Sequence, residues 1–86
     1  MAYRVELYRG VSEALRTFPL RIQGQIVRRI EALAEDPAPP GSKPLHGKHE
    51  GLRRIRSGKY RIIYAVQEEA LRILVVKVAH RREAYR

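Results

Sequence analysis

The chain contains, at residues 51–66, the segment GLRRIRSGKYRIIYAV, in which apolar and basic side chains alternate on both sides of a turn at 57–59. A period of two is typical of a β-strand whose two faces have different surroundings. The sequence therefore predicts strands over 52–57 and 60–67. Because the turn between them is short, these strands must be antiparallel neighbours.

The alternation also separates two faces of the second strand. Arg61, Ile63 and Ala65 share one face. The other face is predicted to pack in the core and is formed by Tyr60, Ile62, Tyr64 and Val66. Because an unpaired charge is too costly in a core, we expect Arg61, and at least one of Arg53 and Arg54, to face solvent or a ligand.

The residues before this hairpin predict a strand and a short helix. Residues 3–9 alternate between apolar and polar side chains, which indicates a half-buried strand ended by Gly10. Ser12 is placed to cap the helix that follows. The inward side chains of that helix recur at helical spacing: Val11, Leu15 and Phe18.

A second helix is predicted from Pro19, whose missing N–H costs nothing in a first helical turn. Its apolar stripe consists of Ile22, Ile26, Ile30 and Leu33, widened by Val27 and Ala34. Its solvated side carries Arg21, Arg28, Arg29 and Glu31. Gly24 weakens a helix by roughly 1 kcal/mol against Ala, so we expect it to mark close packing against the first helix.

A surface linker, DPAPPGSKP at 36–44, and a third, most apolar strand over 71–78 complete the order of elements. Strand, helix, helix and three tightly linked strands indicate an α+β fold. In it a helical hairpin covers one face of a small antiparallel sheet, and the other face stays open to a substrate.

The length and composition limit the class of protein. A chain of 86 residues builds one modest core, so residues 1–86 are predicted to form a single domain. The absence of cysteine excludes disulfides and thiolate metal sites. No apolar run of about 18 residues indicates a membrane span, and the first ten residues do not resemble a signal peptide. We expect a cytoplasmic protein.

The net charge of +9 is concentrated in one half of the chain. Residues 1–42 hold six Lys and Arg against five Asp and Glu, whereas residues 43–86 hold twelve against four. Such asymmetry is typical of a surface that binds a polyanion.

Arginine is well suited to phosphate, because its planar fork of donors stays protonated and matches phosphate oxygens. When a 2′-hydroxyl attacks RNA, cations placed at the phosphate stabilise the charge that develops. No acid–base pair of Glu and His, or of two His, is evident in the sequence. Such a site would depend on holding the RNA in position, ideally with a large partner.

Three segments together resemble the RelE family of toxins. GLRRIRSGKYRIIYAV at 51–66 is similar to the strand–turn–strand core of that family, KPLHGKHEG at 43–51 to its lead-in, and VAHRREAY at 78–85 to its ending. The order of elements agrees, and the resemblance covers the whole chain.

The resemblance implies a RelE-like fold and the toxin of a type II toxin–antitoxin system. Such toxins are ribosome-dependent endoribonucleases that cleave mRNA in the A site by 2′-hydroxyl attack, leaving a 2′,3′-cyclic phosphate and a 5′-hydroxyl. The implied partners are the ribosome, mRNA and a cognate RelB-like antitoxin in a hetero-oligomer. We expect no cofactor and no membrane association.

The resemblance also implies roles for four residues. Arg54 stands where the family has a basic residue that assists deprotonation of the 2′-hydroxyl. Arg61 matches the family's arginine that contacts the scissile phosphate. Arg81 matches the arginine that stabilises or protonates the leaving group. Tyr85 matches a tyrosine that stacks on the substrate base. Because arginine hardly ever loses its proton, Arg54 can stabilise charge, and the general base stays unassigned.

Other basic side chains are expected to contact RNA: Lys43, Lys48, Arg53, Arg56, Lys59, His80 and Arg82. No metal site is predicted, because His46, His49 and Glu50 have no further ligand in evidence nearby.

Alternative roles remain open for two of these residues and for the protein as a whole. Arg61 could pair with Glu50 or Glu83, and Tyr85 could be an ordinary C-terminal anchor. The whole protein could instead be a ParE-like inhibitor of DNA gyrase, or a non-catalytic module that binds RNA or the ribosome.

Overall fold

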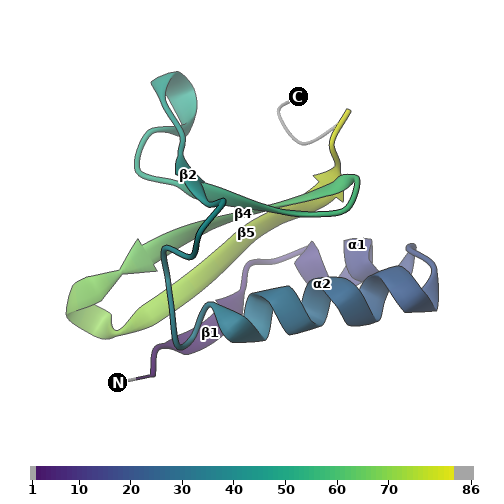
Figure 1. Ribbon diagram of the computed structural model, residues 1–86, viewed down its shortest axis with the longest axis horizontal. Helices are drawn as coiled ribbons and strands as arrows, with labels where there is room; N and C mark the ends of the chain where they lie inside the picture. Colours follow the sequence, from purple (N-terminus) through teal and green to yellow (C-terminus); the bar gives the residue numbers. More distant parts are fainter. Residues whose placement is uncertain (1, 83–86) are drawn as a thin grey trace.

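A five-stranded sheet carries two helices on one face (Figure 1). The computed structural model describes residues 2–82. Its elements are β1 (Arg4–Leu7), α1 (Val11–Arg16), α2 (Leu20–Ala32), β2 (Lys43–Pro44), the 3-10 helix η1 (Gly47–His49), β3 (Arg53–Ser57), β4 (Tyr60–Gln67), the 3-10 helix η2 (Glu68–Ala70) and β5 (Arg72–His80). The predicted α+β fold, with a strand and a helical hairpin before the main strands, is confirmed.

The strands lie in the order β1-β5-β4-β3-β2. The pairs β3–β4 and β4–β5 are antiparallel, as the tight turns predict. The pair β2–β3 is antiparallel as well, but β1 runs parallel to β5. A parallel pair needs a long crossover, and the helices together with the later strands supply it. Since β3 and β5 occupy both edges of β4, the outer edge of β5 is left for β1.

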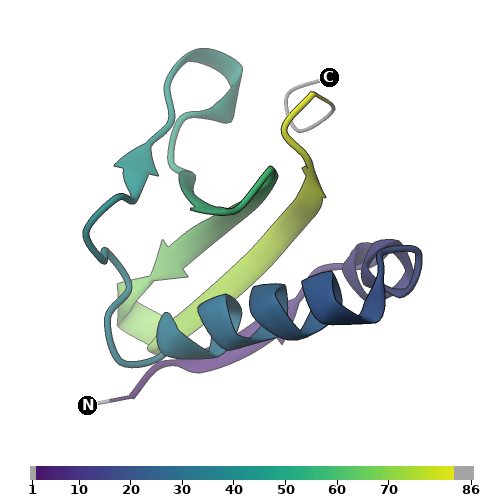
Figure 2. The ribbon, with the colours of Figure 1, turned by 45° about the vertical axis from the view of Figure 1, so that its right-hand side comes forward.

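Strand β2 lies inside the segment that the sequence predicts to be a linker. Lys43 pairs with Arg54, and Pro44 pairs with Arg53, in antiparallel register. Two residues are too few to produce a visible period, and proline is tolerated because β2 is an edge strand. From β2, the chain rises away from the sheet on the side opposite the helices (Figure 2).

The alternation of β4 divides the sheet as predicted. Ile62 and Tyr64 are fully buried in the core. The core lies between the sheet and the helices and consists of Val11, Leu15, Ile26, Ile30, Leu33, Ile55, Ile62, Tyr64, Ile73, Val75 and Val78. The hydroxyl of Tyr64 donates a hydrogen bond of 2.7 Å to the carbonyl of Pro37, which ties the end of the helical hairpin to the sheet.

The helices differ from expectation in two details. The residue at the start of α1 is Gly10, with φ of +88°, and no side chain caps the helix, so the predicted cap by Ser12 is wrong. In α2 the predicted stripe is confirmed at Ile26 and Ile30, but Val27 is 40% exposed and does not widen it.

Gly24 does not mark close packing between the helices, as the sequence analysis expected. A Cβ at this position would have one neighbour within 4 Å, the Nη1 atom of Arg28 at 3.8 Å. This is an ordinary contact with a residue of the same helix, so the site has room for a larger side chain.

Gly24→Ala is therefore expected to stabilise the protein by about 1 kcal/mol, because alanine favours helix more strongly. The thermal unfolding midpoint should rise by roughly 4–8 °C. Gly10→Ala is the matched control and should lower the midpoint, because the positive φ of Gly10 strains any residue with a Cβ. A lower midpoint for Gly24→Ala would contradict this account of α2.

Candidate functional site

Three arginines line a hollow at one end of the sheet, which we call the arginine pocket. Its lining is Arg56, Gly58, Tyr60, Arg61 and Arg81, and its volume is about 80 Å³. Strands β3 and β4 each bring one arginine to it from their ends near the β3–β4 turn, and the third, Arg81, directly follows β5.

The register explains how these side chains meet. Arg56 of β3 is the direct cross-strand partner of Arg61 of β4. Arg81 follows β5, and its backbone N–H donates a hydrogen bond of 2.8 Å to the carbonyl of Lys59 in the turn. Like charges directly opposite each other destabilise a sheet, so packing alone does not account for this pair of arginines. Both guanidinium groups are suited to bind an anion.

Arg54 lies on the same face of β3 as Arg56 but is only 7% exposed. Its cross-strand partner Ile63 is 2% exposed. The expectation that this face is uncovered is therefore wrong at the centre of the sheet, and of the two arginines Arg53 and Arg54 it is Arg53 that stays partly exposed. The Nη1 atom of Arg54 donates a long hydrogen bond of 3.5 Å to the carbonyl of Gly41. This long hydrogen bond compensates only weakly for the hydration that the guanidinium group of Arg54 loses on burial. Such an arrangement is more typical of functional sites than of cores.

Arg54→Met is expected to leave the free energy of unfolding unchanged or to raise it, because an apolar side chain of similar length avoids the loss of hydration. Breaking a well-paired buried ion pair would instead cost about 3–5 kcal/mol. Urea unfolding measures the difference. Tyr64→Phe is the control that loses a good buried hydrogen bond, with an expected cost of about 1 kcal/mol. A loss above that of Tyr64→Phe would refute the account of Arg54.

Two residues predicted to contact RNA lie on the helix side of the sheet. Arg53 pairs across the strands with the core residue Tyr64, and its Nη2 atom donates to the Ser42 hydroxyl at 2.8 Å. The ring of His80 lies edge-on to that of Tyr60, with centroids 5.5 Å apart. These contacts hold both side chains in structural positions, and neither of them lines the arginine pocket.

The remaining predicted residues are spread over the surface. Lys59 and Arg82 are exposed and adjoin residues of the arginine pocket in the sequence. Lys43 in β2 and Lys48 in η1 are also exposed, on segments that do not line this pocket. Tyr85 lies outside the described residues.

A second basic hollow was missed by the sequence analysis, which assigned Arg28 and Arg29 to a solvated helix face. This hollow, the helix groove, has a volume of about 400 Å³ and is lined by Gln25, Arg28, Arg29, Arg56, Ser57 and Gly58. The local sequence contains no signal for it, because the hollow exists only where the β3–β4 turn meets α2.

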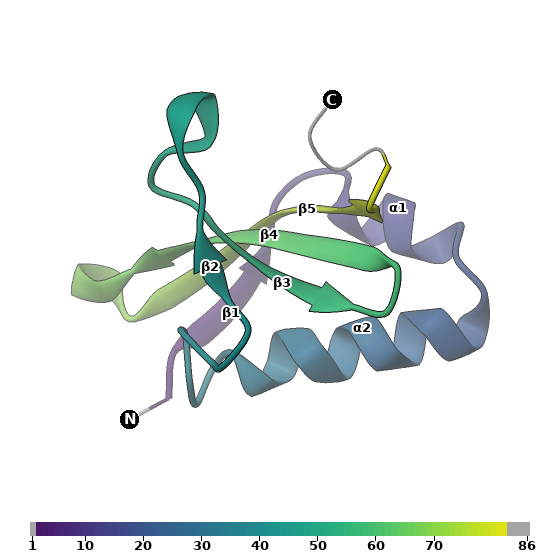
Figure 3. The ribbon, with the colours of Figure 1, turned by 45° about the horizontal axis from the view of Figure 1, so that its top comes forward.

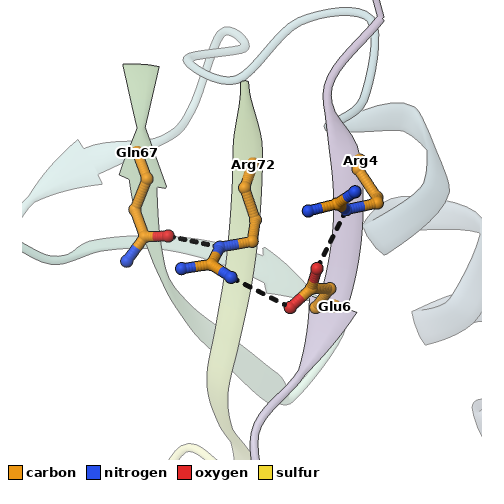
Figure 4. A network of polar contacts seen from close by, with 4 residues as sticks. All are labelled: Arg4, Glu6, Gln67 and Arg72. Atoms are coloured by element: carbon orange, nitrogen blue, oxygen red, sulfur yellow. Dashed lines mark hydrogen bonds and ion pairs between the residues drawn. The ribbon is translucent and has the colours of Figure 1, made fainter. Parts of the chain in front are cut away.

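The other end of the sheet carries a network in which one carboxylate pairs with two arginines (Figure 4). Glu6 accepts from Arg4 at 2.9 Å and from Arg72 at 3.3 Å, and Arg72 also donates to Gln67. These exposed pairs add little stability. Their main effect is to offset part of the positive charge at this end.

Within residues 2–82 no helix is long and apolar enough to cross a membrane. Over the same residues no three His, Asp or Glu side chains gather where they could hold a metal ion.

Comparison with known proteins agrees with this fold. A family model described as the ParE toxin of the type II toxin–antitoxin system parDE matches residues 6–85. Toxin RelE of Mycobacterium tuberculosis is 31% identical over 98% of this chain and 87% of its own length. Toxin RelG of the same organism is 30% identical over 100% of this chain and 99% of its own length.

Solved structures are similar as well. The archaeal RelE–RelB complex from Pyrococcus horikoshii contains a chain with a TM-score of 0.83 and 30% identity, covering 98% of this chain and 100% of that one. A chain of the toxin–antitoxin complex RelBE2 from Mycobacterium tuberculosis has a TM-score of 0.84 and 26% identity, covering 93% and 99%. The protein belongs to the RelE/ParE superfamily and is the toxin of a type II toxin–antitoxin system.

Proposed function

We propose that this toxin is a ribosome-dependent, metal-independent endoribonuclease that cleaves mRNA in the A site. The observation that carries the proposal is the arginine pocket, where Arg56, Arg61 and Arg81 converge on one small hollow. The identity of about 30% to proteins named RelE and RelG supports it. Its site of action would be the cytoplasm, where ribosomes translate.

The chemistry is attack of a ribose 2′-hydroxyl on the neighbouring phosphate, which releases a 5′-hydroxyl and leaves a 2′,3′-cyclic phosphate. Negative charge develops on the phosphate and on the leaving oxygen. Arg61 binds the scissile phosphate, and Arg81 stabilises the leaving oxygen. Guanidinium groups held in position before the reaction stabilise this charge more than they stabilise the bound substrate.

Arg54 contributes charge rather than proton transfer. Its guanidinium is buried on the face that also carries Arg56 and Arg61. Low exposure weakens solvent screening, so its charge acts over a longer distance than a surface charge does. Arginine retains its proton, so the base that accepts the 2′-hydroxyl proton is another group, on the RNA, on the ribosome or in water.

The need for a ribosome follows from what lines the pocket. Among its described lining residues there is no carboxylate and no histidine. Positive charge alone stabilises the transition state only after the RNA is bent into the reactive geometry. The ribosome would supply that geometry by holding the mRNA, and the exposed Lys43, Lys48, Lys59 and Arg82 would contact phosphates around the site.

Arg61→Ala and Arg81→Ala are each expected to reduce cleavage by two or more orders of magnitude, as loss of a group that stabilises transition-state charge does. A translation reaction followed by primer extension on the mRNA measures it. The backbone hydrogen bond of Arg81 to Lys59 does not need the side chain, so Arg81→Ala should keep the fold.

Arg16→Ala, which removes an exposed charge from α1, is the matched control and should cleave like the unmodified toxin. Unchanged cleavage by both pocket variants would refute the assignment of the site. Absence of A-site cleavage by the folded unmodified protein would refute the endoribonuclease itself.

The proposed partner is a RelB-like antitoxin in a hetero-oligomer. The similar chains from Pyrococcus horikoshii and Mycobacterium tuberculosis were solved in complexes with such proteins. A net charge of +9 favours an acidic segment that folds on binding.

Inhibition of DNA gyrase is the second candidate function, favoured by the match to the ParE family model over residues 6–85. It predicts loss of supercoiling activity when purified toxin is added to gyrase, with no cut mRNA in the translation reaction. The arginine pocket would then have no role in activity, and Arg61→Ala would inhibit gyrase as well as the unmodified toxin does.

A further inference from the structure

The arginine pocket and the helix groove are joined around the β3–β4 turn. Arg56 and Gly58 line both hollows. In Figure 3 the end of β3 and this turn lie close to α2. The two hollows therefore form one basic path that leads from the open face of the sheet over the turn to α2.

A contact within the protein holds one arginine of the helix groove in position. The Nε atom of Arg29 donates a hydrogen bond of 3.2 Å to the backbone carbonyl of Arg56, which links α2 to β3. The Nη1 atom of Arg28 lies 3.8 Å from the place where Gly24 would carry a Cβ, so its guanidinium is folded back along the helix. Positioned side chains lose less freedom when a ligand binds.

The helix groove lacks negative charge. Its lining contains no carboxylate, and Arg28, Arg29 and Arg56 form no ion pair with a residue among 2–82. At the other end of the sheet, Arg4 and Arg72 both pair with Glu6. Three guanidinium groups around one hollow, none with an acidic partner among residues 2–82, favour an anionic ligand.

The chemistry of the lining selects the kind of anion. Apart from the aliphatic parts of the arginines, the helix groove is formed by Gln25, Ser57 and Gly58, with no large apolar side chain. A protein partner would need an apolar centre in its interface. A phosphodiester backbone needs only donors and positive charge.

We propose that the helix groove binds the phosphodiester backbone of RNA that continues from the arginine pocket. The proposal rests on the proposed function, because the arginine pocket is then the place of the scissile phosphate. The RNA crosses the β3–β4 turn at Gly58, where the absence of a side chain leaves space, and its next phosphates meet Arg28 and Arg29.

The test compares two variants that remove the same charge from the same helix. Arg28 lines the helix groove, whereas Arg21 is equally an exposed arginine of α2 but does not line it. The probe is a 2′-O-methyl oligoribonucleotide, which cannot be cut by 2′-hydroxyl attack, in lengths of two and eight nucleotides. Affinities are measured at several salt concentrations, and thermal unfolding checks that both variants are folded.

Arg28→Ala is expected to weaken binding of the longer probe about tenfold, the loss of one charge-assisted hydrogen bond. Its plot of log affinity against log salt should become shallower by about 0.7 for each lost phosphate contact. Arg21→Ala should behave like the unmodified protein. The dinucleotide fills only the arginine pocket and should bind both variants equally. Equal affinities of the two variants for the longer probe would overturn the proposal.

Binding to vacant ribosomes distinguishes the source of the RNA. If Arg28→Ala weakens binding to the oligonucleotide, the backbone is that of mRNA. If it weakens binding to ribosomes alone, the groove contacts ribosomal RNA, and the proposed continuation of the bound RNA from the arginine pocket is wrong. If it weakens binding to an acidic antitoxin segment while both RNA affinities stay unchanged, the groove is a protein interface and the proposal is wrong.

The same samples separate this inference from the endoribonuclease. Cleavage by the unmodified toxin with equal behaviour of Arg28→Ala and Arg21→Ala would reject the helix groove and leave the proposed function intact. Selective weakening of RNA binding by Arg28→Ala, without any cleavage by the unmodified toxin, would reject the endoribonuclease and leave the helix groove intact.

Discussion

The alternation of side chains along β4 is the constraint on which the other features depend. Ile62 and Tyr64 fill the core beneath the helices, and this orientation directs Arg61 and Ile63 to the opposite face. A shift of one residue in the register would put a guanidinium group in the core. The burial of two apolar residues therefore also positions the side chain that we assign to the scissile phosphate.

Much of the fold follows from local periodicity. The period of two at 51–66 predicts β3 and β4, and the helical spacing of Ile26 and Ile30 predicts α2. The parallel pairing of β1 and the existence of β2 do not follow, because both depend on pairing between segments far apart in the chain. The free space beside Gly24 does not follow from local periodicity either, because it depends on where α1 packs.

The candidate site was only partly predictable for the same reason. Arg61 and Arg81 fall on motif positions, and the register brings them to one hollow with Arg56. Burial of Arg54 could not be inferred from alternation, which sorts residues between faces but does not say what covers a face. Arg28 is exposed, as its helical position predicts, but that it lines a hollow depends on the β3–β4 turn, which lies far from it in sequence.

The ion-pair network of Arg4, Glu6 and Arg72 has a consequence for how the toxin reaches its target (Figure 4). Glu6 offsets part of the positive charge at one end of the sheet, whereas no carboxylate is among the described residues that line the arginine pocket, and this asymmetry gives the molecule an electric dipole. In the field of a polyanion such a dipole turns, so that its arginine-rich end leads during approach. This reorientation acts over about 8 Å at physiological ionic strength, and it raises the share of encounters that begin in a productive pose.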